Sequence, residues 1–195
     1  LPIPGRQLDG LHQAMEYLPW ANRATHGDPV LGADGQPPIT ARDKRVIIIG
    51  GGDTGADCLG TALRQGARSV HQFEIMPRPG ADRDPSTPWP TYPLMYRVSS
   101  AHEEGGERVF SVNTERFVGR EGKVTGLRAH EVVMAGGKFE KVEGSDFELA
   151  ADLVLLAMGF VGPERPGLLT DLGVELSDRG NVVRNADFET SVPGV

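Results

Sequence analysis

The sequence predicts an α/β fold in which a Rossmann-like parallel sheet carries an antiparallel β-meander in place of one helical crossover. Two short runs, 45–49 and 152–158, are apolar without interruption after their first residue, which is typical of parallel strands covered on both faces. Between them, three segments alternate apolar and polar residues, which indicates antiparallel strands with one solvent face. These segments are 108–119, 122–134 and 137–144.

The chain opens with a predicted helix and a predicted loop. Apolar residues recur at helical spacing over 12–23. Pro19 lies inside this segment, and because proline has no backbone N–H, we expect it to bend or divide the helix. The following stretch, 27–38, is rich in glycine and proline and is predicted to be a linker or an exposed loop.

The next elements form a predicted β-α-β unit. The strand at 45–49 runs into a glycine cluster, and residues 54–65 have the apolar spacing of a helix. Gly66 is well placed for the C-terminal cap of that helix, and 69–76 is the second strand. Two parallel strands joined through a helix are expected to have a right-handed crossover.

A long proline-rich stretch, 77–93, separates this unit from the predicted meander. Loops of this length are usually functional or mobile. Trp89, Tyr92 and Pro93 within it either form a wall beside a bound ligand or partner, or pack only as the loop's own small core. After the meander the chain returns to the second apolar run, which ends at Gly159.

Composition and charge exclude several classes of function. The net charge of −7 argues against a nucleic-acid-binding surface, which needs clustered lysine and arginine. No apolar run approaches the roughly 20 residues that span a bilayer, and the first ten residues lack the pattern of a secretion signal. Cys58 is the single cysteine, so an internal disulfide and a cysteine-rich metal site are excluded. We therefore expect a cytoplasmic protein that binds neither nucleic acid nor membranes.

Three glycines between the first strand and the helix satisfy the spacing G-x-G-x-x-G. Gly50 would make the tight turn, Gly52 would let the backbone approach a pyrophosphate, and Gly55 would allow the helix to pack on the strand. The N-terminus of the helix then presents free N–H groups and a partial positive charge to the anion. Because the glycines lie between a buried strand and a capped helix, they predict a dinucleotide site rather than a turn that only packs.

The residues that would contact the adenosine end leave two interpretations open, a site for NAD and a site for NADP. Glu74 lies 19 residues after Gly55, where an acid accepts a hydrogen bond from a ribose 2′-hydroxyl in an NAD site. Arg78 and Arg83 follow the second strand, and guanidinium groups there favour the 2′-phosphate of NADP. Either the arginines or Glu74 could instead face solvent. On balance the two arginines predict NADPH over NADH.

Three further residues are weaker candidates. Gly159 lies at the carboxyl edge of the sheet, where it either admits the nicotinamide half or only ends the strand. Cys58 falls within the predicted helix and is expected to be a small buried hydrophobe. His102 lacks the second histidine of a zinc-helix motif, so no metal site is predicted. No catalytic side chain is predicted either, which is consistent with hydride chemistry in which the cofactors react.

Four segments together resemble the small (beta) subunit of bacterial glutamate synthase. They are "VIIIGGGDTGADCLGTALRQGARSV" at 46–70, "WPTYP" at 89–93, "SSAHEEGGER" at 99–108 and "ADLVLLAMGFVGPE" at 151–164. The resemblance covers the whole chain in order. Dihydropyrimidine dehydrogenase and NADPH-dependent ferredoxin reductases share the glycine turn, but they are less similar in the last two segments.

This resemblance implies the NAD(P)-binding domain of an FAD/NAD(P)-linked reductase. Hydride would pass from NADPH, with NADH possible, to FAD, and iron–sulfur clusters would carry electrons to the large subunit for the synthesis of glutamate. The turn implied to hold the pyrophosphate consists of Gly50, Gly51, Gly52, Asp53 and Thr54. Arg78 and Arg83 are implied to contact the 2′-phosphate, and Gly159 is implied to lie near the nicotinamide.

The chain lacks three features of that family: an earlier glycine fingerprint for FAD, cysteines for iron–sulfur clusters, and a later Gly-Asp segment. We therefore expect a fragment in which 1–40 is a stub of the FAD domain with a helix, 41–165 is the NADPH-binding domain, and 166–195 is a stub returning to the FAD domain. FAD and the clusters are expected only in the full-length parent, and the fragment alone is expected to be inactive. The expected partners are the FAD domain of the same parent chain and the glutamate synthase large subunit.

Two alternatives remain open at this point. The chain could belong to another ferredoxin-type reductase or to a flavoprotein like dihydropyrimidine dehydrogenase. It could also be a binding module that keeps the fold without catalysis.

Overall fold

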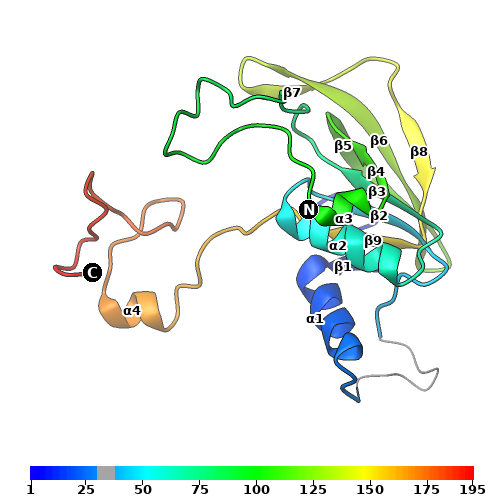
Figure 1. Ribbon diagram of the computed structural model, residues 1–195, viewed down its shortest axis with the longest axis horizontal. Helices are drawn as coiled ribbons and strands as arrows, with labels where there is room; N and C mark the ends of the chain where they lie inside the picture. The colour runs from blue at the N-terminus through cyan, green and yellow to red at the C-terminus, as the bar shows by residue number, and fades with distance from the viewer. Residues whose placement is uncertain (30–37) are drawn as a thin grey trace. The chain divides into compact units, whose positions relative to one another are not determined.

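The computed structural model describes residues 1–29 and 38–195, and these form two compact units, Leu1–Met158 and Gly159–Val195 (Figure 1). Residues 11–13, within the expected stub at 1–40, pair with 154–156 in the sheet of the first unit. The expected domain boundaries stay a prediction. Most of the predicted loop at 27–38 lies outside the described residues.

The first unit is built on a five-stranded sheet in which every neighbouring pair is parallel. In spatial order the strands are β1 (Leu11–Gln13), β9 (Leu153–Leu156), β2 (Arg45–Ile49), β3 (Ser69–Phe73) and β4 (Glu107–Val109). The predicted parallel sheet is confirmed. The edge strands β1 and β4 were not predicted as part of it, since each is only three residues long.

The described residues of this unit form three helices: α1 (Ala14–Thr25), α2 (Asp53–Arg64) and α3 (Ser100–Glu103). The helix α1 runs through Pro19 without ending there, although the proline removes one backbone donor. Tyr17 is fully buried on α1, and its hydroxyl donates a 2.9 Å hydrogen bond to Gln65 just beyond α2. Gly66 follows with a φ of +83°, which suits its predicted place at the end of α2.

The predicted meander forms a second, antiparallel sheet. Its strands are β5 (Val112–Arg120), β6 (Lys123–Ala135), β7 (Lys138–Lys141) and β8 (Phe147–Ala150). The long strand β6 pairs with β5 along one edge and with β7 and β8 along the other. The strand β8 was not predicted, and the predicted segment 108–119 divides between β4 and β5 because Ser111, with a φ of +57°, turns the chain.

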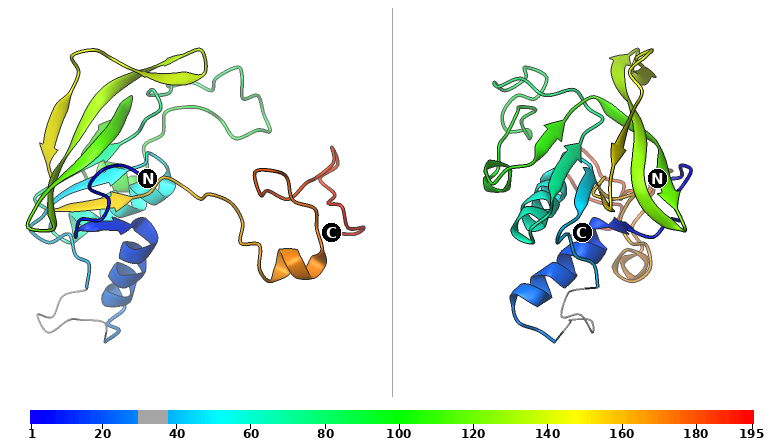
Figure 2. Two further views of the ribbon diagram at one scale, coloured as in Figure 1. Left: turned by 180° about the vertical axis from the view of Figure 1, so that it is seen from behind. Right: turned by 90° about the vertical axis from the view of Figure 1, so that its right-hand side faces the viewer.

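The parallel sheet lies between the helices and the meander, and its two faces carry separate apolar clusters (Figure 2). Side chains alternate along a strand, so Ile48 and Leu155 pack with α1 and α2, whereas Ile47 and Val154 pack with the meander. All four side chains are fully buried. Burial on both faces explains why the central strands are apolar without alternation.

The second unit holds the helix α4 (Leu168–Leu172), which ends at Gly173 in the left-handed conformation, and an isolated bridge between Leu176 and Val182. Within residues 1–29 and 38–195, none of the helices combines the length and the apolar character that crossing a membrane requires.

Candidate functional site

The glycine turn joins β2 to the N-terminus of α2, as predicted. Gly50 has a φ of +127°, which side-chain-bearing residues rarely adopt, and a Cβ there would overlap the carbonyl of Ala157. The Gly50 N–H donates a 2.8 Å hydrogen bond to the carbonyl of Phe73, the last residue of β3. Gly50 therefore fixes the turn between the ends of β9 and β3.

Gly52 and Gly55 differ in the space around them. A Cβ at Gly55 would overlap the carbonyl of Gly50, so this glycine is needed for close packing of α2 against the turn. A Cβ at Gly52 would meet no described atom within 4 Å, and its φ of −81° is open to any residue. The surface over Gly52 is thus accessible to a ligand, which is the role predicted for it.

Gly52 is the N-cap of α2, and no described side chain caps the helix there. The first hydrogen bond to the Gly52 carbonyl comes from Ala56, at 3.0 Å. The N–H groups of the first helical turn have no partner within a helix, and the helix dipole adds a partial positive charge at this end. This end of α2 therefore suits an anion such as a pyrophosphate.

Glu74 follows β3 and lies directly against the turn. Its Oε2 accepts a 2.8 Å hydrogen bond from the Gly51 N–H, and its Oε1 accepts one of 2.8 Å from the Met76 N–H. The two bonds hold the carboxylate at the carboxyl end of the strand, beside the open N-terminus of α2. Its predicted position next to the dinucleotide site is consistent with this geometry.

A chain of side-chain hydrogen bonds supports the turn from behind. Gln72 is 1% exposed, and its Nε2 donates a 2.9 Å bond to the carbonyl of Gly50. His102 bonds through Nε2 to the Gln72 Oε1 at 3.0 Å, and its Nδ1 accepts from the Ser99 N–H at 3.2 Å. Burial and the nearby Arg108 lower the pKa of His102, which favours the neutral ring that this network requires.

A cavity of about 720 Å³ opens over the turn and is bounded on its far side by the proline-rich loop. Its lining includes the predicted residues Gly51, Gly52, Asp53, Glu74 and Arg78. A dinucleotide's adenosine half fits a space of this size, since ligand pockets run from about 300 to 1,000 Å³. The structure thus brings five of the predicted residues to one cavity.

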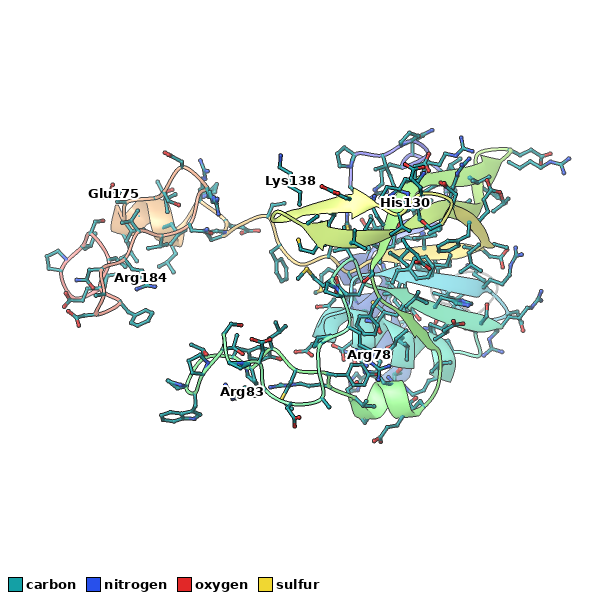
Figure 3. All side chains as sticks on the ribbon, turned by 90° about the horizontal axis from the view of Figure 1, so that it is seen from above. Arg78, Arg83, His130, Lys138, Glu175 and Arg184 are labelled. Atoms are coloured by element: carbon teal, nitrogen blue, oxygen red, sulfur yellow. The ribbon has the colours of Figure 1, made fainter. Side chains whose placement is uncertain are left out.

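The two predicted arginines lie in different surroundings (Figure 3). Arg78 lines the cavity, with its guanidinium carbon 4.0 Å from the centre of the Tyr96 ring. Arg83 lies farther out along the loop, and its Nη1 donates to the carbonyls of Thr87 and Thr91 at 2.8 and 3.0 Å. Arg83 is not among the described residues that line the cavity.

The remaining predicted residues lie at or beyond the edge of this arrangement. Thr54 is in the first turn of α2. Gly159 is the first residue of the second unit, with a φ of +82°. Of the aromatic residues in the loop, Tyr92 lines the cavity although it is 72% exposed, whereas Trp89 is 83% exposed.

Sequence reasoning missed several residues of the cavity wall. Tyr96, Arg108 and Phe110 form a stack in which the Arg108 guanidinium lies over both rings, at 4.8 and 5.3 Å. Arg108 comes from β4, which pairs with β3, and this pairing brings it beside the end of the glycine turn. No local sequence pattern predicts these residues, because they come into contact only when β4 pairs with β3 in the sheet.

Two groups outside the cavity bear on the predictions of no redox thiol and no metal site. Cys58 is fully buried, as predicted, and burial raises the pKa of its thiol to about 12. Glu115, His130 and Asp146 lie together on the meander with ligand atoms within 4.8 Å of one another. Arg128 already lies 3.4 Å from both of those carboxylates, so the cluster is an ion-pair network among the described residues.

The chain matches the family model described as pyridine nucleotide-disulphide oxidoreductase over residues 1–195. It is 77% identical over its full length to the glutamate synthase [NADPH] small chain of Mycobacterium tuberculosis, of which it spans 40%. It is 39% identical to the glutamate synthase [NADH] of Schizosaccharomyces pombe, of which it spans 10%. The thioredoxin reductase of T. acidophilum has a similar fold, with a TM-score of 0.62 at 20% identity over the whole chain and 51% of that protein.

Proposed function

The chain belongs to the pyridine nucleotide-disulphide oxidoreductase family, and from this premise we propose that it is the nicotinamide-dinucleotide-binding, electron-input domain of a flavin-dependent oxidoreductase. The parent enzyme is then a glutamate synthase, since the chain resembles small chains of that enzyme over its whole length. In this proposal the dinucleotide delivers hydride to FAD for the synthesis of glutamate.

One observation carries the proposal: the surface over Gly52 is open at the N-terminus of α2 and faces the cavity. A pyrophosphate placed there would accept hydrogen bonds from the free N–H groups of the first helical turn. Glu74 and Arg78 line the same cavity and would contact the adenosine half. Gly159 remains a candidate for the nicotinamide side, on the ground of its place in the sequence after β9.

The other components of the reaction would come from outside these 195 residues. FAD, when bound, accepts the hydride and releases electrons one at a time. This sequence holds one G-x-G-x-x-G turn, so we assign the FAD site to the rest of the parent chain. Its single cysteine cannot supply the four thiolates of an iron–sulfur cluster. The proposed partners are accordingly the FAD domain and the glutamate synthase large subunit, in a cytoplasmic setting.

The donor is either NADPH or NADH. The bacterial relatives carry NADPH in their names and the fungal relatives carry NADH. NADPH is the candidate that the arginines beyond β3 favour by their charge. Both dinucleotides share the pyrophosphate, so the site at Gly52 serves either one.

The proposal is tested with the full-length flavoprotein that contains this chain. Loss of flavin absorbance after anaerobic mixing with NADPH and with NADH measures hydride delivery. We expect Gly52→Ala to raise the Kd of both dinucleotides at least about tenfold, because a methyl group would occupy the pyrophosphate position. Thr61→Ala, farther along α2, is the matched control and should leave both values unchanged.

Two results would contradict this function. The absence of binding at millimolar concentrations of both dinucleotides would favour a module that keeps the fold without a cofactor. Steady-state oxidation of NADPH by the assembled enzyme that does not depend on glutamine and 2-oxoglutarate would favour another ferredoxin-type reductase.

A further inference from the structure

The glycine turn depends on contacts from other side chains to keep its shape. Glycine accepts a wide range of backbone angles, and three of them follow one another at 50–52. The planar peptide group between Gly50 and Gly51 is held at both ends. Its carbonyl accepts a 2.9 Å hydrogen bond from Gln72, and its N–H donates one of 2.8 Å to Glu74. The orientation of this peptide sets the direction of the N–H groups that follow, which are the groups that would face a pyrophosphate.

The Gln72 amide also contacts the other end of the turn. A Cβ at Gly55 would lie 2.5 Å from the Gln72 Nε2, so the missing side chain of Gly55 leaves room for this amide. Gln72 is 1% exposed and lies on the same face of β3 as Val70, which packs with α2. One buried polar side chain therefore contacts the turn both after β2 and within the first turn of α2.

The hydrogen bonds that fix Gln72 run in one direction only. The Ser99 N–H can only donate, so the His102 Nδ1 that it contacts at 3.2 Å is the acceptor nitrogen of a neutral ring. The hydrogen then lies on Nε2, which donates to the Gln72 Oε1 at 3.0 Å. This leaves the Gln72 NH2 group facing the Gly50 carbonyl, as the bond between them requires. If the amide turned over, two acceptor oxygens would be buried against each other, which is costly.

His102 is held in place by the packing of α3 on α2. Ala101 lies against Gly60, where an added Cβ would be 2.9 Å from the Ala101 Cβ. Arg64 at the end of α2 and Glu104 at the end of α3 form an ion pair of 2.5 Å. The His102 ring therefore reaches from a helix anchored on α2 to the buried side chain that holds the turn.

From these contacts we infer that His102 is a positioning residue for the dinucleotide. Through its Nε2–H it sets the orientation of the Gln72 amide, and thereby of the peptide that precedes the pyrophosphate position. The inference rests on the function proposed above and adds a residue to it. Because the pyrophosphate is common to NADH and NADPH, His102 serves both equally. Hydride transfer takes place at the nicotinamide end of the ligand, so its rate should not depend on this network.

The test replaces His102 by two amides that keep different ring nitrogens. Glutamine places its amide nitrogen near the position of Nε2 and can still donate to Gln72, whereas asparagine reaches only the position of Nδ1. Anaerobic flavin reduction in the full-length flavoprotein, followed against the concentration of NADPH and of NADH, gives the Kd and the limiting rate separately. We expect His102→Asn to raise both Kd values by the same factor, at least about fivefold, with little change in the limiting rate. His102→Gln should restore both Kd values to within about twofold of the wild-type protein.

The matched control is His71→Asn, in the residue next to Gln72 on β3. The side chain of His71 lies on the other face of the strand, 3.2 Å from Glu107, so the Kd values should stay at those of the wild-type protein. Equal Kd values in the two His102 variants would overturn the inference, because the Nε2–H would then not matter to the site. Unequal losses for NADPH and NADH would also overturn it, since His102 would then contact the adenosine end itself.

A double-mutant cycle separates the hydrogen-bonded chain from a general loss of stability. Gln72→Met keeps the length of the buried side chain and removes both polar groups, so it should raise both Kd values as His102→Asn does. In that background, His102→Asn should add less than about twofold, because the chain is already broken. Additive losses would overturn the inference. If the wild-type flavoprotein binds neither dinucleotide, the proposed function itself fails, whereas normal binding by His102→Asn overturns only the role of His102.

Discussion

The glycine turn at 50–55 and the loop at 77–98 line the same cavity, but they are held in place by different contacts. The turn follows β2 directly and is hydrogen-bonded to Phe73 and to buried Gln72 of β3, and three of its four glycines leave no room for a side chain. The loop bonds mainly to itself, as in the pairs Asp84–Leu94 and Tyr96–Gly80, and its aromatic residues Trp89 and Tyr92 are exposed.

This contrast matches the two parts of the proposed ligand. The pyrophosphate is common to all nicotinamide dinucleotides, and it would lie on the half of the cavity that long-range contacts fix. The adenosine end varies between NADH and NADPH, and it would lie between Glu74, which belongs to the fixed half, and Arg78, which belongs to the loop. Because the turn is fixed and the loop bonds mainly to itself, changes in the loop can alter the preference between NADH and NADPH without disturbing the sheet.

Gly50→Ala should have the largest effect, because it disrupts the glycine turn, which is the fixed part of the cavity wall. The added Cβ would overlap the Ala157 carbonyl at a backbone conformation that alanine avoids. We expect a loss of about 3 kcal/mol or more in the free energy of unfolding, measured by denaturant titration of the full-length protein. Gly52→Ala is the matched control, with an expected loss of about 1 kcal/mol or less. Similar losses in both would show that the turn is not fixed in this way.

Asp152→Asn should have an intermediate and pH-dependent effect at the far end of the same sheet. Arg45 donates to the Asp152 carboxylate from its backbone N–H and from two guanidinium nitrogens. Hydrogen bonding by Arg45 lowers the pKa of Asp152 from 3.8 to about 2. Because the pKa is lowered, this contribution to stability is present above about pH 4 and is lost as the pH falls towards 2.

The carboxylate of Asp152 is 36% exposed, so solvent screening reduces the contribution to about 1 kcal/mol. Unfolding measured at pH 7 should show this difference between the wild-type protein and Asp152→Asn, and at pH 2 the difference should be close to zero. A difference that does not change with pH would mean that packing, rather than the ion pair, accounts for the loss.

Trp89→Ala should have the smallest effect, since Trp89 lies in the loop, which bonds mainly to itself. The side chain is 83% exposed, so little apolar surface is lost from the core. We expect the free energy of unfolding to change by about 0.5 kcal/mol or less. A destabilisation comparable to that of Gly50→Ala would show that the loop is part of the core. The turn and the loop would then not differ in how firmly they are held.

Much of the fold could be predicted because the central elements carry their pattern locally. The strand β2 begins and ends as predicted, since its apolar run is bounded by Lys44 and Gly50. The helix α2 begins one residue before the prediction, at Asp53. The strands β1, β4 and β8 were missed because three or four residues with mixed polarity acquire their partners only through distant pairing.

The candidate site also divides into a part that local sequence patterns predict and a part that depends on distant pairing. The turn was predictable from the spacing of glycines, whose reasons are geometric and local. The Tyr96–Arg108–Phe110 stack was not, because it depends on the pairing of β4 with β3. The sequence also could not tell that Arg83 would be used inside its loop, or that Glu74 would be held by the turn itself. The roles assigned to individual site residues stay predictions.

The position of β9 has a consequence for the order in which the chain can fold. It is the last strand of the first unit, yet it lies between β1 and β2, and it pairs with both. Until Leu153–Leu156 leave the ribosome, the two earlier strands have no common neighbour and the apolar faces on either side of the gap stay uncovered. Closing such long loops is slow, and unpaired strand edges promote aggregation. The unit is therefore completed only at the end of its own synthesis, and chaperones that shield apolar strands would be most useful before that moment.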